Sequence, residues 1–323
     1  MSDNALLAID QVTKTFPWGK HRIEAVRRVS LSIGTAETLG LVGESGSGKS
    51  TLGRLAIGLL APDRGTVTVS GVNLGAVAPR TLRTMRQTLQ IVFQDPGAAL
   101  NARVSVAANI LEPLVVHNIG TRDERLRRVG RLLERVGLTT AHGPAMPDEL
   151  SGGQLQRVMI ARALALGPKL LVCDEILSAL DLSVQAQVLS LLDDLRTTED
   201  LAYLFISHNL SAVAYLSDRI GVMYLGELVE WAPTAALVAA PKHPYTQALF
   251  QSILEVPTSK AARKSLTGIP GEVPSAIDRP LGCAFHTRCP LAMDICRQEA
   301  PPWLTVGDQH QAACHALAAV EEG

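Results

Sequence analysis

"GESGSGKST", at residues 43–51, decides the fold class of this chain. The segment follows the apolar run "TLGLV" and precedes the helical pattern "LGRLAIGLL", which is the strand and helix context of a phosphate-binding loop. Its residues are Gly43, Glu44, Ser45, Gly46, Ser47, Gly48, Lys49, Ser50 and Thr51. The glycines let backbone N–H groups surround phosphates, Lys49 can reach the terminal phosphates, and the Ser50 hydroxyl can ligate Mg²⁺. The segment therefore predicts an α/β fold with a site for nucleotide phosphates.

A pair of carboxylates follows a second apolar run, "LLVCDE" at residues 170–175. Asp174 is placed to hold Mg²⁺ through water, and Glu175 to orient or deprotonate an attacking water. Acid pairs at strand ends can also be purely structural. Downstream of a phosphate-binding loop, catalysis is the favoured interpretation.

A second anion site is indicated by "ELSGGQLQR" at residues 149–157. Ser151 and Gln154 have the spacing of a capping box, which predicts a helix that begins at Ser151. Gly152 and Gly153 carry no side chain that would keep a ligand from the first N–H groups, and the helix dipole favours a phosphate there. An ordinary capped helix is the alternative.

The rest of the chain alternates strand and helix patterns. We expect strands at 25–33, 37–43, 65–71, 89–94, 169–175 and 202–208, with helical structure at about 96–167. In "RDERLRRVGRLLERVGL", residues 122–138, the spacing predicts one apolar face. That face comprises Leu126, Val129, Leu132, Leu133 and Val136. Strands followed by helices favour a parallel sheet with crossover helices.

Composition excludes several classes of protein. The 323 residues are 47% hydrophobic, with 30 Lys and Arg against 31 Asp and Glu, so no general attraction to nucleic acid is expected. The N-terminus has no signal-peptide pattern, and no apolar run approaches the roughly 20 residues of a membrane span. We expect a soluble, cytoplasmic protein in which disulfides are rare.

The ordered set of motifs resembles the ATP-binding cassette (ABC) family, the ATPase subunits of membrane transporters. Besides the motifs above, the set includes Gln94 in "IVFQDP", "SALD" at Ser178–Asp181 and His208 in "FISH". The resemblance implies an α/β P-loop NTPase (RecA-like) core with an antiparallel β subdomain and an α-helical subdomain. The ATPase domain would span residues 1–235, with the helical subdomain at about 96–167.

The resemblance also implies a role for the second anion site. Two ATPase subunits would face each other head to tail, so that "SGGQ" of one contacts ATP held by the loop of the other. By position, Gln94 would sense Mg²⁺ and the attacking water and link to the transmembrane subunits, and His208 would contact the γ-phosphate. Asp181 would contact the opposing subunit. Phe16, ahead of the first expected strands, would stack on adenine, although it could equally be a core residue.

The C-terminal part, residues 236–323, indicates which branch of the family the chain resembles. "HPYTQALFQSI", "GEVPS" and "GCAFHTRCPLAMDIC" resemble the extension of ATPase subunits from oligopeptide and dipeptide importers and their nickel-importing relatives. Four cysteines lie there, Cys283, Cys289, Cys296 and Cys314, whereas Cys173 lies in an apolar strand and is expected in the core. Zinc sites usually have tighter cysteine pairs. The resemblance implies a 4Fe-4S cluster, with zinc or free thiols as alternatives.

The resemblance further implies partners and a location. These are a second ATPase subunit, commonly a paralogue, two transmembrane permease subunits and, indirectly, an extracytoplasmic substrate-binding protein. The chain would lie peripherally on the cytoplasmic face of the inner membrane and would not bind nucleic acid. Peptides are the expected cargo, and nickel or another small solute is the alternative. A non-transport ABC ATPase is a lesser alternative, and a non-hydrolysing regulator would lack Glu175 or His208.

Overall fold

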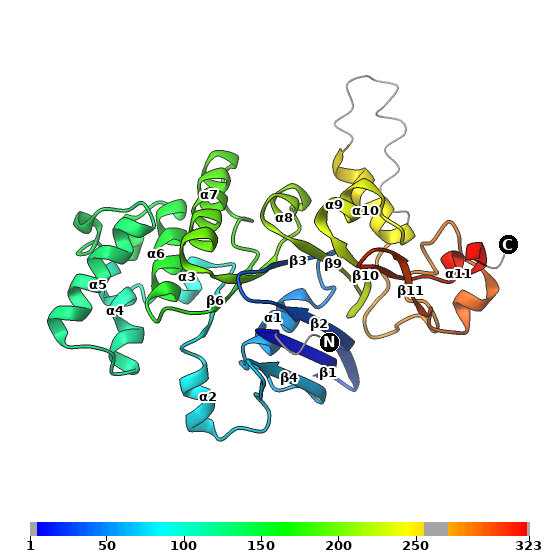
Figure 1. The fold of residues 1–323 in the computed structure, drawn as a ribbon, viewed down its shortest axis with the longest axis horizontal. Helices are drawn as coiled ribbons and strands as arrows, with labels where there is room; N and C mark the ends of the chain where they lie inside the picture. The colour runs from blue at the N-terminus through cyan, green and yellow to red at the C-terminus, as the bar shows by residue number, and fades with distance from the viewer. Residues whose placement is uncertain (1–4, 255–270, 322–323) are drawn as a thin grey trace.

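The computed structural model describes residues 5–254 and 271–321. In these residues an eight-stranded mixed sheet forms the centre of the molecule (Figure 1). Its strands, in spatial order, are β11 (Trp303–Gly307), β12 (His310–Ala313), β10 (Glu227–Pro233), β9 (Arg219–Tyr224), β3 (Thr38–Val42), β8 (Ala202–Ile206), β7 (Leu170–Asp174) and β6 (Leu89–Val92). The strands from β9 to β6 run parallel, and those from β10 to β11 are antiparallel.

The central strands are buried because their sequences are almost entirely apolar. β3, β7 and β8 are buried at every position, as expected of parallel strands covered on both faces. One face carries α7 (Leu182–Glu199), α8 (Leu210–Leu216), α9 (Thr234–Ala239) and α10 (Pro244–Leu254) (Figure 1). The other face carries α1 (Lys49–Ala56) and a smaller antiparallel sheet (Figure 1).

The smaller sheet contains a strand that the sequence patterns did not predict. Its order is β2 (His21–Ile33), β1 (Leu7–Trp18), β4 (Arg64–Val69) and β5 (Val72–Asn73). β1 was missed because its pairing with β2 shifts register three times, which interrupts the alternation of apolar and polar residues. Phe16 consequently lies inside a strand, paired with Ile23, and the expectation that it precedes the strands is wrong.

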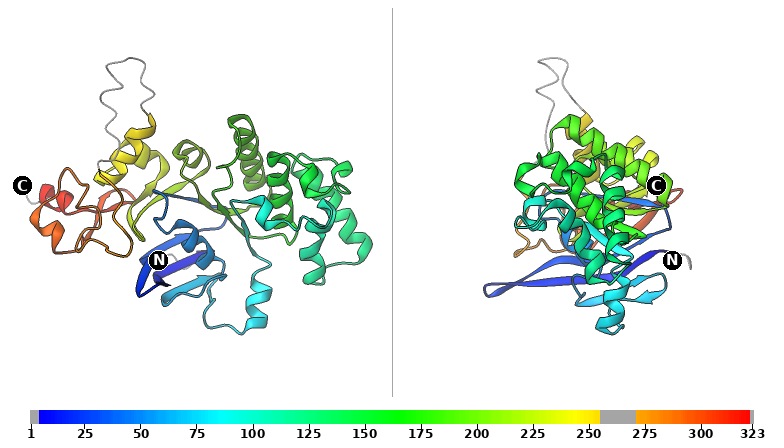
Figure 2. Two further views of the ribbon diagram at one scale, coloured as in Figure 1. Left: turned by 180° about the vertical axis from the view of Figure 1, so that it is seen from behind. Right: turned by 90° about the vertical axis from the view of Figure 1, so that its left-hand side faces the viewer.

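A helical layer lies at the β6 end of the main sheet, and the C-terminal part lies at the opposite end (Figures 1 and 2). The layer comprises α3 (Pro96–Ala99), α4 (Val106–Val116), α5 (Arg122–Arg135), two short 3₁₀ helices (Thr140–His142 and Pro147–Glu149) and α6 (Gly152–Leu164). A further helix, α2 (Pro79–Met85), projects below the main sheet (Figure 1).

The apolar face predicted for α5 is only partly correct. Val129, Leu133 and Val136 are buried, but the Leu126 side chain is 48% exposed. At 3.6 residues per turn, Leu126 lies about 60° from Val129, at the edge of the apolar stripe. It also lies in the first turns of the helix, which reduces the neighbours available to cover it.

The C-terminal part joins the main sheet. β12 pairs with β10 through Glu230 and Trp231, and β11 pairs with β12. Beneath this junction, His310 Nε2 lies 2.6 Å from Glu230 Oε1, and both side chains are buried. The chain ends its described part with a 3₁₀ helix (Asp294–Arg297), β11, β12 and α11 (His315–Glu321). The sheet therefore extends across residue 235, and α9 contains that position.

No helix in the described ranges has both the length and the apolar content to cross a bilayer.

Candidate active site

The phosphate-binding loop connects β3 to α1 and has the backbone geometry that its glycines permit. Gly48, the residue before α1, has a φ of 100°, and a Cβ there would lie 2.1 Å from the Ala25 carbonyl oxygen. Gly43 has a φ of 150°, and a Cβ there would lie 2.2 Å from the Met223 carbonyl oxygen. Side chains at these positions would therefore collide with the backbone of neighbouring strands. The loop leads directly into the N-terminus of α1, and the first N–H groups of a helix suit a phosphate.

Lys49 is buried in the loop, with its ammonium group directed at loop oxygens. Nζ donates to the carbonyl oxygens of Gly43 at 2.8 Å and Glu44 at 2.9 Å, and to Ser47 Oγ at 3.3 Å. Burial lowers the pKa of Lys49, while the carboxylates of Glu175, Asp174 and Glu44 act in the opposite direction. Phosphate oxygens could replace these loop acceptors, because they are stronger partners for an ammonium group.

Ser50 and Asp174 bring two oxygens together at the carboxyl end of the sheet. Ser50 Oγ donates to Asp174 Oδ1 at 2.6 Å. Burial raises the pKa of Asp174, and the hydrogen bond from Ser50 opposes that effect. A hydroxyl and a carboxylate suit Mg²⁺, which keeps several waters and takes further ligands from substrate phosphates.

Glu175 follows β7 in a constrained backbone conformation. Its φ is 51°, in the left-handed region, and its N–H donates to the Ile206 carbonyl oxygen at 2.9 Å. His208, just past β8, places Nδ1 3.6 Å from Glu175 Oε2, and its side chain is 61% exposed. The structure therefore brings together two of the predicted catalytic residues at the ends of adjacent strands.

Gln94 reaches the same edge from the end of β6. Its Nε2 donates to Ser178 Oγ at 3.4 Å, and Ser178 Oγ donates to the Glu175 carbonyl oxygen at 2.9 Å. The predicted groups thus gather beyond the carboxyl ends of β3, β6, β7 and β8, where α/β sheets commonly bind ligands.

The "SGGQ" segment forms the start of α6, as the sequence predicts. Ser151 Oγ accepts from the Gln154 N–H at 3.4 Å, and Gln154 Oε1 accepts from the Ser151 N–H at 2.9 Å. Gly152 has open space where a Cβ would lie, whereas a Cβ on Gly153 would lie 2.6 Å from Val184 Cγ1. Ser151 and Gly152 are exposed, and the helix packs on α3, α4, α5 and β6.

Asp181 is the N-cap of α7. Its Oδ1 accepts from Ser183 Oγ at 2.7 Å and from the Val184 N–H at 3.0 Å. These hydrogen bonds lower the pKa of the Asp181 carboxyl. Within this chain Asp181 therefore caps α7. Its contact with an opposing subunit stays a prediction.

Two residues that contact the phosphate-binding loop were missed at the sequence level. Tyr245, in α10, accepts a hydrogen bond at Oη from the Glu44 N–H at 2.9 Å. Arg288 donates to the two Glu44 carboxylate oxygens at 2.7 and 3.1 Å. The sequence signal was Glu44 itself, because a carboxylate beside a phosphate site opposes anion binding unless a cation is near.

The four C-terminal cysteines lie in one region. Cys283 and Cys289 are half-buried, Cys296 and Cys314 are buried, and the Cys283 N–H donates to the Cys296 carbonyl oxygen at 2.9 Å. Burial raises the pKa of Cys283 to about 11. Across residues 5–254 and 271–321, no group of three or more His, Cys, Asp or Glu side chains is arranged to hold a metal ion.

The fifth cysteine and the nearby histidines are accounted for by packing. Cys173 is fully buried in β7, as predicted. His310 pairs with Glu230, and His315 Nε2 lies 3.0 Å from the Glu299 carbonyl oxygen.

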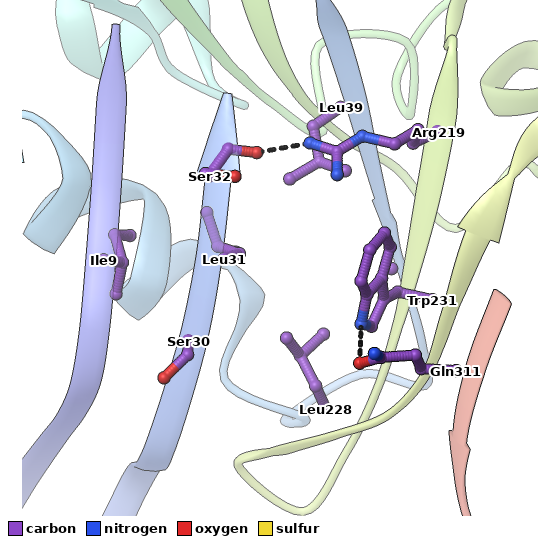
Figure 3. Close-up of a pocket in the computed structure, with 10 residues that line it drawn as sticks. Ile9, Ser30, Leu31, Ser32, Leu39, Arg219, Leu228, Trp231 and Gln311 are labelled. Atoms are coloured by element: carbon purple, nitrogen blue, oxygen red, sulfur yellow. Dashed lines mark hydrogen bonds between the residues drawn. The ribbon is translucent and has the colours of Figure 1, made fainter. Parts of the chain in front are cut away.

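A separate cavity of about 410 Å³ lies between the two sheets (Figure 3). Arg219 donates to the Ser32 carbonyl oxygen, and Trp231 Nε1 donates to Gln311 Oε1 at 3.2 Å (Figure 3). The Arg219 guanidinium also lies 5.2 Å from the Trp231 ring centroid. Since residues 43–51 are absent from its lining, this cavity is distinct from the phosphate site.

Together, the phosphate-binding loop, the strand-end acid pair and the parallel sheet define a P-loop NTPase. Comparison with known proteins gives the family. Residues 26–178 match the family described as "ABC transporter", and residues 229–296 match "Oligopeptide/dipeptide transporter, C-terminal region".

Two relatives cover most of the chain. A protein of Brucella abortus (strain 2308), named for peptide import and ATP binding, is 49% identical over 298 residues, which cover 92% of this chain and 88% of that protein. The oligopeptide transport ATP-binding protein AppF of Bacillus subtilis (strain 168) is 45% identical over 294 residues, covering 91% and 89%.

A solved structure resembles the ATPase part. The ATP-binding cassette MJ0796, a dimer in a post-hydrolysis state bound to ADP and Pi, superposes with a TM-score of 0.66 and 28% sequence identity. The match covers 71% of this chain and 98% of that one.

This chain belongs to the ATP-binding subunits of ABC transporters, in the oligopeptide/dipeptide branch. The fold class and the resemblance inferred from sequence are confirmed. The protein is an ABC-type ATPase, and its family implies ATP as substrate and Mg²⁺ as cofactor.

Proposed function

We propose that this chain powers the import of peptides by closing and opening against a second ATPase subunit, a paralogue. The observation that carries the proposal is the separation of the two anion sites within the chain. α1 lies under the middle of the main sheet, whereas α6 lies in the helical layer at the sheet's end (Figure 1). A nucleotide on one loop would meet an "SGGQ" helix from the other subunit.

In this arrangement, different residues of the chain would bind ATP, hold Mg²⁺ and activate the attacking water. Lys49 would bind the terminal phosphates, and Ser50 with Asp174 would hold Mg²⁺, which supplies charge neutralisation at the phosphates. Glu175 would orient or deprotonate the attacking water, Gln94 would contact that water, and His208 would contact the γ-phosphate. Closure would exclude bulk water and complete the set of donors.

Other positions would complete the nucleotide and subunit contacts. We propose that Phe16 stacks on adenine, that residues 43–51 surround the phosphates, and that Ser151 to Gln154 contact the partner's nucleotide. Asp181 would touch the opposing subunit besides capping α7. Residues 1–235 would form the ATPase domain, with a helical subdomain at about 96–167, and residues 236–323 the extension.

Peptide cargo is supported by the names of the relatives and by the match of the C-terminal region. The chain would act on the cytoplasmic face of the inner membrane, with two permease subunits and, indirectly, an extracytoplasmic substrate-binding protein.

Deleting the gene in its source organism is expected to abolish uptake of a labelled dipeptide or oligopeptide while leaving nickel uptake unchanged. Uptake should return when the native gene is restored. If only nickel uptake is lost, the cargo is nickel and not peptide. If neither uptake changes and the protein copurifies with ribosomes or DNA instead of polytopic membrane proteins, an importer role is excluded.

A 4Fe-4S cluster on Cys283, Cys289, Cys296 and Cys314 stays a prediction from the family resemblance. Its support is the gathering of the four thiols, since the charges of the other three act on the pKa of Cys283. Anaerobically purified protein is expected to contain iron and acid-labile sulfide, both lost in Cys296→Ser. Zinc in their place would indicate the alternative metal, and absence of all three would indicate free thiols.

A further inference from the structure

Glu44 presents an electrostatic problem at the nucleotide site. It is the second residue of a loop that must receive the polyanionic phosphates of ATP. Like charges at short range oppose binding, and the opposition is stronger where water is partly excluded. The effect of Glu44 is felt inside the site, because its charge acts on the pKa of Lys49. A cation beside Glu44 would remove this repulsion.

Arg288, from the C-terminal part of the chain, supplies that cation. Its Nη1 and Nη2 donate to Oε2 and Oε1 of Glu44 at 2.7 and 3.1 Å, a two-pronged geometry that suits guanidinium and carboxylate. Arg288 is 6% exposed. Its guanidinium lies 5.9 Å from the Tyr224 ring centroid and 6.0 Å from that of Phe285, and Nη1 donates to Tyr224 Oη at 3.4 Å.

Tyr245 fixes the backbone of the same loop residue. Its Oη accepts from the Glu44 N–H at 2.9 Å, and its side chain is fully buried. The Tyr245 ring centroid lies 4.7 Å from that of Tyr224 and 5.4 Å from that of Phe285. Tyr245 belongs to an aromatic cluster with Tyr224 and Phe285. The cluster therefore contacts the main chain of Glu44 directly through Tyr245, and it packs against Arg288, which binds the Glu44 side chain.

We propose that Arg288 and Tyr245 are positioning residues for the phosphate-binding loop, and that Arg288 cancels the Glu44 charge that would otherwise repel the nucleotide. The C-terminal part then does more than extend the sheet. It sets the affinity of the loop for ATP, through residues outside the consensus loop and the strand-end acids. The inference needs ATP binding by the loop, and it is independent of the cargo and of any metal on the cysteines.

Replacing Arg288 by an apolar side chain is the direct test. Arg288→Met in the full-length chain is expected to weaken ATP binding by about tenfold, because the Glu44 charge is left uncompensated beside the phosphates. The loss should be smaller for ADP, which carries less charge. Equilibrium binding of the two nucleotides, by calorimetry at fixed salt, measures the difference.

Two further variants separate charge from structural damage. Glu44→Gln combined with Arg288→Met should restore ATP affinity to within about threefold of the native chain, since it removes the charge that Arg288 neutralises. Arg288→Lys should be intermediate, because it keeps the charge and loses the two-pronged contact. Thermal unfolding and circular dichroism establish that each variant is folded.

A matched control lies elsewhere in the same region. Arg279 pairs with Glu227 and donates to the Leu225 carbonyl oxygen, so Arg279→Met also removes a guanidinium and its ion pair. ATP affinity should be unchanged in this variant. Equal weakening in Arg279→Met, or ATP binding within twofold of native in folded Arg288→Met, would overturn the proposal. The proposal would also be overturned if the double variant, Glu44→Gln with Arg288→Met, bound ATP as weakly as Arg288→Met alone.

If Arg288→Met does not fold, Glu44→Gln alone decides the question. The glutamine amide has the shape of the native carboxylate without its charge and leaves the Arg288 charge uncompensated near the phosphates, so ATP should bind more tightly than before. A tenfold loss in this variant would show that the pair acts only on the structure of the loop. Tyr245→Phe, which removes only the hydroxyl, should raise the KM for ATP more than it lowers kcat.

Discussion

Glu175→Gln is expected to lower ATP hydrolysis in the assembled complex by roughly 100-fold or more, while ATP binding stays intact. The amide has nearly the same shape as the carboxylate but cannot accept a proton from the attacking water. The backbone of this residue, with its φ of 51° and the hydrogen bond from its N–H to the Ile206 carbonyl oxygen, should be retained because glutamine differs only at the end of the side chain. Steady-state phosphate release and equilibrium ATP binding measure the two effects separately.

The control for this variant is a carboxylate remote from the strand ends. Glu134→Gln, at an exposed position of α5, should leave both hydrolysis and binding unchanged. If Glu175→Gln hydrolyses ATP at the native rate in the complex, Glu175 is not the catalytic base. Loss of ATP binding in the same variant would point to a structural role instead.

Gly152→Asp is expected to reduce hydrolysis by the complex by about 100-fold or more without altering ATP binding by the isolated chain. A Cβ at Gly152 meets no atom within 4 Å, so the substitution fits the folded chain. An aspartate in the first helical turn is also favourable for the helix itself. The loss would therefore arise from repulsion of the phosphate that the partner subunit presents.

Gly152→Ala is the matched control, because it adds the Cβ without the charge. It should retain clearly more activity than Gly152→Asp. Gly153 is unsuitable for this test, since a Cβ there lies 2.6 Å from Val184 Cγ1. Full hydrolysis by a complex containing Gly152→Asp in every copy of the motif, or by a lone monomer, would contradict a nucleotide site shared between two subunits.

Local features of the site could be predicted from sequence with residue accuracy. Ser151 and Gln154 indicated their capping box by spacing alone, and it is present. The apolar runs before Lys49 and Asp174 predicted buried parallel strands, and β3 and β7 are buried throughout. β1 escaped prediction because its shifted register removes the regular alternation on which strand prediction depends.

The cysteines show what a family resemblance leaves open. The four thiols of the C-terminal part do gather in one region, yet the described side chains form no group arranged for a metal. Sequence intervals constrain how far apart residues can lie, but the directions of the side chains depend on the packing around them.

By itself, the sequence determined the phosphate-binding loop, the capped α6 helix and the acids at the end of β7, because each depends on residues within a few positions of one another. Only the tertiary structure decided what meets Glu44. Arg288 lies 244 positions away, and no local pattern specifies such a pairing. Burial of Arg288 favours the pairing, since a guanidinium taken out of water is costly unless a carboxylate meets it.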